Sequence, residues 1–343
     1  MNASRLSVRR PTVRWRADWL RSPLHDVVMA SLWIPFAGAA LVVNDDPEGL
    51  RWLVSATLLF SFLHQPLTLW LVYGDAAERR AHARMVVWAP VAFVLAVPIA
   101  ASTSPELVAL VAGLWNVGHT LRQRYGLCRL YGRLGSIDCG ADNRLLWSWL
   151  VLAVFVAFAG ADLGSVAHTV GLGRRNRALI EAVESAQVAV TVLLPVALVA
   201  AILIAARWIR IELQRPTHSA SRLVYIGSTA AMLAVLAVNP IAGFVGYVGA
   251  HAAEYFLVVR WRVDRAAQRR TAGDAVGWLA RRVGGIGTMG LYAVAVSVLT
   301  VTIRAMDART VASVLVLTLG ALHLLFDGVI WRSPRSATAI QEN

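Results

Sequence analysis

Charge is scarce in this chain of 343 residues: 15% of them are charged, 57% are hydrophobic, and the mean hydropathy is +0.59. Soluble domains contain roughly a quarter charged residues, so the composition excludes a soluble globular protein. Lysine is absent, and all 33 basic residues are arginine. The sequence has two cysteines, Cys128 and Cys139, which we expect to be free thiols in a cytoplasmic loop, because two sulfurs alone do not make a zinc site.

Apolar runs long enough to cross a bilayer, roughly 20 residues each, dominate the sequence. We predict ten spans, at 26–44, 51–73, 85–103, 105–124, 145–164, 186–206, 222–238, 241–259, 285–304 and 310–331. The fold class is therefore an all-α, polytopic integral membrane helix bundle of about ten transmembrane helices. We divide the chain into a basic cytoplasmic N-terminal arm (1–24), the bundle (25–331) and a cytoplasmic tail (332–343).

Segments between the spans are too short for a soluble domain, so any chemistry must come from the spans and their ends. The first 24 residues are polar and Arg-rich, and we expect no cleavable signal peptide. No internal repeat supports an inverted-repeat transporter.

Arginine-rich segments alternate with segments poor in basic residues, which predicts an even number of spans with both termini cytoplasmic. Arg174, Arg175 and Arg177, in a predicted external loop, are the exception. The net charge of +13 lies in short loops, so it indicates topology in a cytoplasmic (inner) membrane and not a nucleic-acid partner.

Four of the eight histidines fall inside predicted spans: His64, His119, His251 and His323. They lie 9, 5, 8 and 8 residues from the predicted cytoplasmic ends of their spans, at a depth of roughly 8–13 Å. His82, His218 and His168 lie in loops, where we expect solvated side chains. The shared depth predicts one layer of imidazoles in the cytoplasmic half of the bilayer.

Polar residues accompany these histidines at helical spacing. Asn116 and Gln123 flank His119, Glu254 and Tyr255 follow His251, and Asp327 follows His323. A carboxylate one turn from a histidine can ligate a metal with it, or orient the ring by accepting its second proton. Ionisable groups inside a span need a partner or a function.

We therefore predict that His64, His119, His251, His323 and Asp327 bind a metal, most plausibly non-haem iron. Glu254, Asp327 and Tyr255 are the predicted catalytic residues. His25, Asp26, Asn116 and Gln123 are predicted to support the site or the substrate, although His25 and Asp26 could also simply cap the first span. Histidines and carboxylates can equally serve as hydrogen-bonding contacts between helices.

The leading hypothesis is a metal-dependent oxygenase, desaturase or hydroxylase that acts on a lipid or isoprenoid in the cytoplasmic half of the bilayer. In this histidine layout, including His25-Asp26 at the start of the first span, the chain resembles the Brp/Blh carotene dioxygenases. The resemblance implies a multi-span bundle with iron held by single histidines from different helices. Their His-x-x-Arg-His cluster and the desaturase boxes His-x-x-x-His and His-x-x-His-His are absent, so substrate identity does not carry over.

Three other functions stay open. Two of the histidines could be axial ligands of haem b in a cytochrome, although the carboxylates would then have no role. A proton-coupled transporter could use the same residues, but the outer halves of the spans are apolar. A polyprenyl-linked glycosyltransferase could use Asp45 and Asp46, but their loop is only a few residues long and resembles a helix start.

Two arginines, Arg122 and Arg124, follow His119 at the predicted cytoplasmic face. They could bind an anionic head group or a cytoplasmic reductase that donates electrons. Ordinary positive-inside anchoring is the simpler explanation for them.

Overall fold

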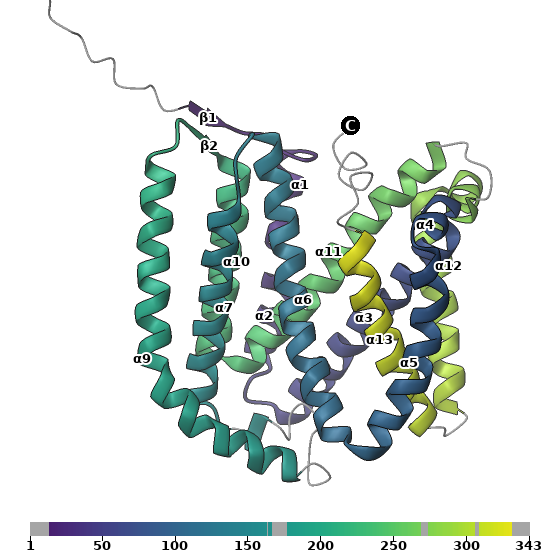
Figure 1. The fold of residues 1–343 in the computed structure, drawn as a ribbon, viewed down its shortest axis with the longest axis horizontal. Coiled ribbons are helices and arrows are strands. Elements are labelled where there is room, and N and C mark those ends of the chain that lie inside the picture. Colours follow the sequence, from purple (N-terminus) through teal and green to yellow (C-terminus); the bar gives the residue numbers. More distant parts are fainter. Residues whose placement is uncertain (1–13, 163, 167–176, 269–273, 306–308, 331–343) are drawn as a thin grey trace, which may run out of the picture.

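The structure, a computed structural model, describes residues 14–162, 164–166, 177–268, 274–305 and 309–330 (Figure 1). It is an all-helical bundle with one short pair of strands at one end. The elements in chain order are β1 (Arg14–Arg16), α1 (Pro23–Ala30), α2 (Trp33–Val42), α3 (Pro47–Gly74), α4 (Ala76–Ala81), α5 (Ala83–Thr103), α6 (Pro105–Leu134), α7 (Gly140–Gly160), α9 (Arg177–Leu213), β2 (Thr217–Ser219), α10 (Ala220–Val238), α11 (Pro240–Gln268), α12 (Ala275–Ala305) and α13 (Arg309–Ile330).

Among the described residues, seven helices are long and apolar enough to cross a membrane, namely α3, α5, α7, α9, α10, α11 and α12. The pair α1 and α2, bent by 43°, can form an eighth span. The predicted all-α membrane bundle is confirmed at this level, and each predicted apolar run overlaps a helix or this pair. The count of ten and the side of the membrane that each end faces stay predictions.

Local sequence sets the helix starts. Asp46 caps α3 by accepting a hydrogen bond from the Glu48 N–H, and Pro47 stands in the first turn, where its missing N–H costs nothing. Asp45 and Asp46 thus belong to a helix start, as expected. The predicted break at Asn239 and Pro240 separates α10 from α11.

Helix α11 occupies the middle of the bundle, and 72% of the residues in its most apolar 18-residue stretch are buried. Small residues allow this position. A β-carbon on Gly249 would lie 2.4 Å from the Phe36 ring, and one on Gly246 would lie 3.0 Å from Cβ of Ala37. Helices α5 and α9 are the opposite case: only 11% and 6% of the residues in their most apolar stretches are buried, so they expose apolar side chains on the outside of the bundle.

The described part of the predicted N-terminal arm is attached to the bundle. Strand β1 pairs in parallel with β2, with Trp15 opposite His218. The prediction of a solvated His218 was wrong, because its ring is buried, lies 5.0 Å from the Trp15 ring and has Nδ1 3.1 Å from Oε1 of Glu212. Residues 1–13, the tail 332–343 and His168 lie outside the described residues.

Both cysteines are free, as predicted, but they are buried and do not lie in a solvated loop. Cys128 is within α6, which continues ten residues past the predicted end of its span, and Cys139 precedes α7. The carboxylate of Asp142 lies beside them, but it accepts hydrogen bonds from Arg222 and Trp208, each at 2.7 Å. These contacts tie α7 to α9 and α10.

Candidate metal centre

The four histidines predicted to share a layer converge on one point. His64 comes from α3, His119 from α6, His251 from α11 and His323 from α13. The ring centroids of His64 lie 4.6 Å from His251 and 4.7 Å from His323, and those of His119 lie 5.1 Å from both His251 and His323. We call this group, His64, His119, His251 and His323, the histidine centre.

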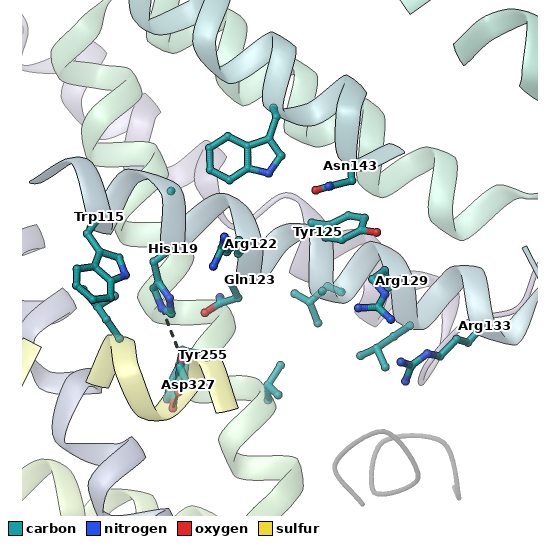
Figure 2. A pocket seen from close by; sticks show the side chains of 18 residues that line it. Trp115, His119, Arg122, Gln123, Tyr125, Arg129, Arg133, Asn143, Tyr255 and Asp327 are labelled. Atoms are coloured by element: carbon teal, nitrogen blue, oxygen red, sulfur yellow. Dashed lines mark hydrogen bonds and ion pairs between the residues drawn. The ribbon is translucent and has the colours of Figure 1, made fainter. Parts of the chain in front are cut away.

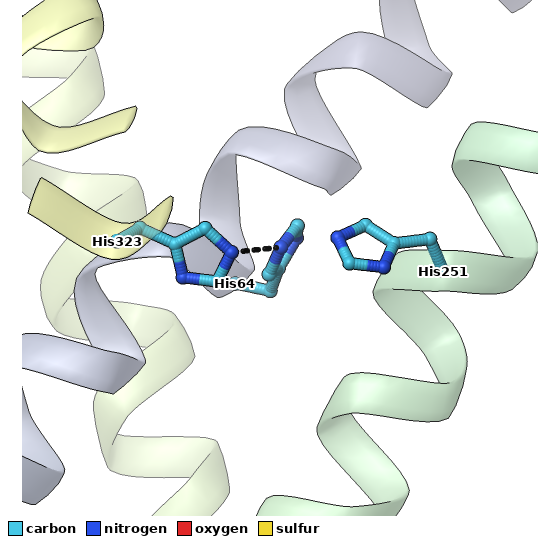
Figure 3. A group of neighbouring side chains, drawn as sticks. All are labelled: His64, His251 and His323. Atoms are coloured by element: carbon cyan, nitrogen blue, oxygen red, sulfur yellow. Dashed lines mark hydrogen bonds between the residues drawn. The ribbon is translucent and has the colours of Figure 1, made fainter. Parts of the chain in front are cut away.

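Two overlapping sets of three ligand atoms in this centre are spaced closely enough to hold an ion. Nε2 of His64 lies 3.2 Å from Nε2 of His323, and Figure 3 shows the His64 ring between those of His323 and His251. Two nitrogens bound at right angles to one metal, each at about 2.1 Å, are about 3 Å apart. One ligand atom each from His64, His251 and His323 lie within 4.8 Å of one another, and the same holds for His119, His323 and Asp327.

Asp327 is held with one oxygen toward the imidazoles. Its Oδ1 accepts hydrogen bonds from the hydroxyls of Thr68 at 2.9 Å and Tyr255 at 2.8 Å. Its Oδ2 lies 3.5 Å from Nε2 of His119 and 3.8 Å from Nε2 of His323. Such anchoring of a carboxylate through its outer oxygen is typical of ligands and of groups that orient metal-bound imidazoles.

Thr68 connects the carboxylate to the ring of His323. Its hydroxyl lies 2.7 Å from Nδ1 of His323 and also contacts the Tyr255 hydroxyl. This contact fixes the ring so that Nε2 faces His64. Thr68 was not among the predicted site residues, although its position one turn after His64 places it on the same face of α3.

Three of the four histidines, His64, His251 and His323, are buried, and the centre leaves polar atoms unpaired. His64 and His251 are each 1% exposed. Within the described residues, neither ring nitrogen of His251 has a hydrogen-bond partner. An unpaired buried polar atom costs about 1–3 kcal/mol, so these nitrogens are suited to a bound ion. The donor set of imidazoles and a carboxylate fits iron and, less selectively, zinc, manganese or copper.

Glu254, predicted to act in catalysis, belongs to a different buried cluster. Its Oε1 forms an ion pair at 2.7 Å with Nη1 of Arg124, and both side chains are almost fully buried. Arg124 also donates to Thr229 Oγ1 at 3.0 Å and to the Ala30 carbonyl at 3.1 Å. Among the described residues, Glu254 is in neither ligand group of the histidine centre.

The residues predicted to support the site lie in different parts of the structure. Gln123 donates from Nε2 to the carbonyl of His251 at 3.1 Å and to Glu254 at 3.4 Å, so it lies between the two clusters. Asp26 accepts a hydrogen bond from the Leu20 N–H at 2.6 Å, and His25 lies 5.4 Å from the Trp261 ring. These two residues organise the start of α1. Asn116 is half-buried in α6, and no contact places it in the centre.

A cavity of about 580 Å³ reaches the centre from one side (Figure 2). It lies between α6, α7, α11 and α13, and touches His119, Tyr255 and Asp327. Aromatic and aliphatic side chains form much of its wall, including Trp115, Trp147, Leu130, Val258 and Leu324. His64, His251 and His323 do not line it, so a molecule in the cavity meets the centre at His119 and Asp327.

The fold itself brings the four histidines and Asp327 together, and this observation does not depend on comparison with a related protein. The sequence matches no protein-family model, no curated protein and no solved structure. The resemblance to the Brp/Blh carotene dioxygenases therefore stays a prediction.

Proposed function

We propose that the protein is a membrane-embedded, metal-dependent oxidoreductase, with iron at the histidine centre. It would act as an oxygenase, desaturase or hydroxylase on a lipid or isoprenoid, using O₂ and electrons from a cytoplasmic reductase. The observation that carries the proposal is the meeting of four imidazoles from four helices beside an anchored carboxylate. A bound iron would supply O₂ activation and one-electron chemistry.

The surrounding residues support this assignment in three ways. Thr68 and Tyr255 hold Asp327 so that Oδ2 stays directed at His119 and His323. Apolar residues of the cavity wall, such as Trp115 and Leu324, would limit the access of water to a reacting carbon beside His119. Tyr255, which lines the cavity and hydrogen-bonds Asp327, is also placed to exchange a proton with a molecule bound there.

Spacing argues against the cytochrome alternative. The His64 ring contacts three other rings, with centroids 4.6 Å from His251, 4.7 Å from His323 and 5.0 Å from Tyr255. A haem macrocycle between two axial histidines would have to displace this packing. The buried carboxylate of Asp327 would also lack a role in such a site.

Metal analysis of the detergent-purified chain, with a visible spectrum of the same sample, tests the proposal. We expect about one iron per chain and no Soret band. Alanine at any of the four histidines should lower the bound iron, whereas His25→Ala should retain it, because His25 contacts Asp26 and Trp261 instead. A Soret band, or no metal after reconstitution with ferrous iron under reducing conditions, would refute the proposal.

A further inference from the structure

The cavity beside the histidine centre has the carboxylate of Asp327 near one end, and its arginines extend along α6 from Arg122, close to His119. His119 and Asp327 lie at one end, and the arginines Arg129 and Arg133 lie further along α6 (Figure 2). We propose that it binds a single-chain amphiphile whose anionic end, a carboxylate or phosphate, lies at Arg129 and Arg133 with its apolar chain directed at His119. This inference rests on the proposed function, because it names the substrate class of the same site.

Charge balance is the first argument. The deeply buried arginines of this protein are neutralised: Arg124 pairs with Glu254, and Arg222 with Asp142, at 2.7 Å each. The cavity arginines Arg122, Arg129 and Arg133 are exposed side chains, and no described residue forms an ion pair with any of them. Among the described residues that line the cavity, the one carboxylate is that of Asp327, beside His119. Three guanidinium groups without a counterion among the described residues favour an anionic ligand in this cavity.

Positive-inside anchoring explains arginines at the ends of spans but does not explain why they line a cavity. Arg129 lies over the Tyr125 ring, with its guanidinium carbon 5.9 Å from the ring centroid. The amide side chain of Asn143 from α7 lines the same region. Guanidinium groups offer paired N–H donors that match carboxylate and phosphate oxygens. The residues around Arg129 therefore form a polar binding site at one end of the cavity, and much of the remaining cavity wall is apolar.

Distance supplies the second argument. Ten residues of helix separate His119 from Arg129 and fourteen separate it from Arg133, which corresponds to about 15–21 Å along α6. Walls of Leu127, Leu130 and Val258 lie along the cavity. A linear chain with its charge at the arginines would thus place a carbon well along its length, and not its charged end, beside the centre.

Two glycines in the cavity lining, Gly126 and Gly328, leave space in the cavity because they have no side chain. A β-carbon on Gly126, which lines the cavity, would have nothing within 4 Å, and the same is true of Gly328 on α13. Gly126→Leu therefore introduces a side chain into the cavity with no clash at its β-carbon, and leucine favours the helix more than glycine does. Gly113 is a matched control, because it is on the same helix, also has open space and does not line the cavity.

The test measures binding of radiolabelled hexadecanoate, hexadecyl phosphate and hexadecanol to the full chain in non-ionic detergent. We expect one or both anions to bind at least about tenfold more tightly than the alcohol, the effect of about one charge-assisted hydrogen bond. R129Q/R133Q should abolish that preference, while Arg210→Gln, an exposed arginine on α9, should keep it. Gly126→Leu should lose binding of all three ligands, and Gly113→Leu should not.

Equal binding of anions and alcohol, no binding of any of the three, or unchanged anion preference in R129Q/R133Q would overturn the inference. The tighter anion identifies the head group as carboxylate or phosphate. Metal content is measured on the same samples. Arginine-dependent binding by a protein that takes up no metal on reconstitution with ferrous iron would uphold this inference and refute the proposed function. Bound iron without anion preference would overturn this inference and leave the proposed function standing.

Discussion

Replacing Arg124 by methionine should destabilise the protein strongly, and also replacing Glu254 should restore part of the loss. The two side chains are 1% and 0% exposed, and their charged atoms lie 2.7 Å apart. Methionine has a similar length but no charge, so Arg124→Met leaves the Glu254 carboxylate buried without its counterion. This experiment also tests whether Glu254 is structural or belongs to the metal centre.

The size of the expected loss of stability follows from the burial of the Arg124 and Glu254 side chains. Breaking a buried ion pair by removing one partner costs about 3–5 kcal/mol, whereas replacing both charges is often close to neutral. The double variant R124M/E254Q still leaves Thr229 Oγ1 and the Ala30 carbonyl without Arg124, which costs about 1–2 kcal/mol. The double variant should therefore be more stable than R124M by about 2–3 kcal/mol.

Thermal unfolding in detergent, followed by intrinsic fluorescence, measures this difference. R124M should lower the midpoint by roughly 4–7 °C, and the double variant should recover about half of that. E254Q should retain the bound metal. A double variant as unstable as R124M, or a folded E254Q that loses its metal, would show that Glu254 does not serve mainly as the partner of Arg124.

Three further predictions test the centre and its scaffold. Asp327→Asn should weaken metal binding by about 10–100-fold, since residues that orient or complete a metal shell typically contribute that much. Equilibrium dialysis measures the affinity, and an unchanged affinity would show that Asp327 is not part of the site. Thr68→Val should also reduce metal affinity, because it removes hydroxyl contacts to both Asp327 and His323; the same dialysis applies, and full affinity would contradict the assigned contacts. Gly249→Leu should reduce the yield of folded protein, because its β-carbon meets the Phe36 ring. Gly290→Leu should not, because a β-carbon there has open space around it. Size-exclusion profiles distinguish the two variants, and equal profiles would refute the close packing of α11.

Counting along the sequence was enough to predict a common histidine layer, because each helix residue advances by a fixed rise. It could not establish that α3, α6, α11 and α13 are neighbours. That adjacency depends on long-range packing, such as the close approach of α11 to α2 at Gly246 and Gly249. The convergence of the histidines therefore needed the three-dimensional fold.

Side-chain partners were the harder part of the prediction. Glu254 is one turn from His251, a spacing that suits a metal site, yet its carboxylate pairs with Arg124 from another helix. In the sequence Arg122 and Arg124 look equivalent, but Arg124 faces the core and Arg122 lines the cavity. Two residues of helix change the direction of a side chain by about 200°, and only the packing of the helices decides which direction is buried.

X-ray absorption spectroscopy of the iron-loaded protein tests the central claim most directly. The proposed centre predicts a shell of nitrogen and oxygen atoms at about 2.0–2.2 Å, with the outer scattering that imidazole rings produce, and loss of that outer signal in His323→Ala. A shell of sulfur at about 2.3 Å would instead place the metal at Cys128 and Cys139, which also lie close together beside Asp142. That result, or a shell without imidazole, would contradict a metal site at the histidine centre.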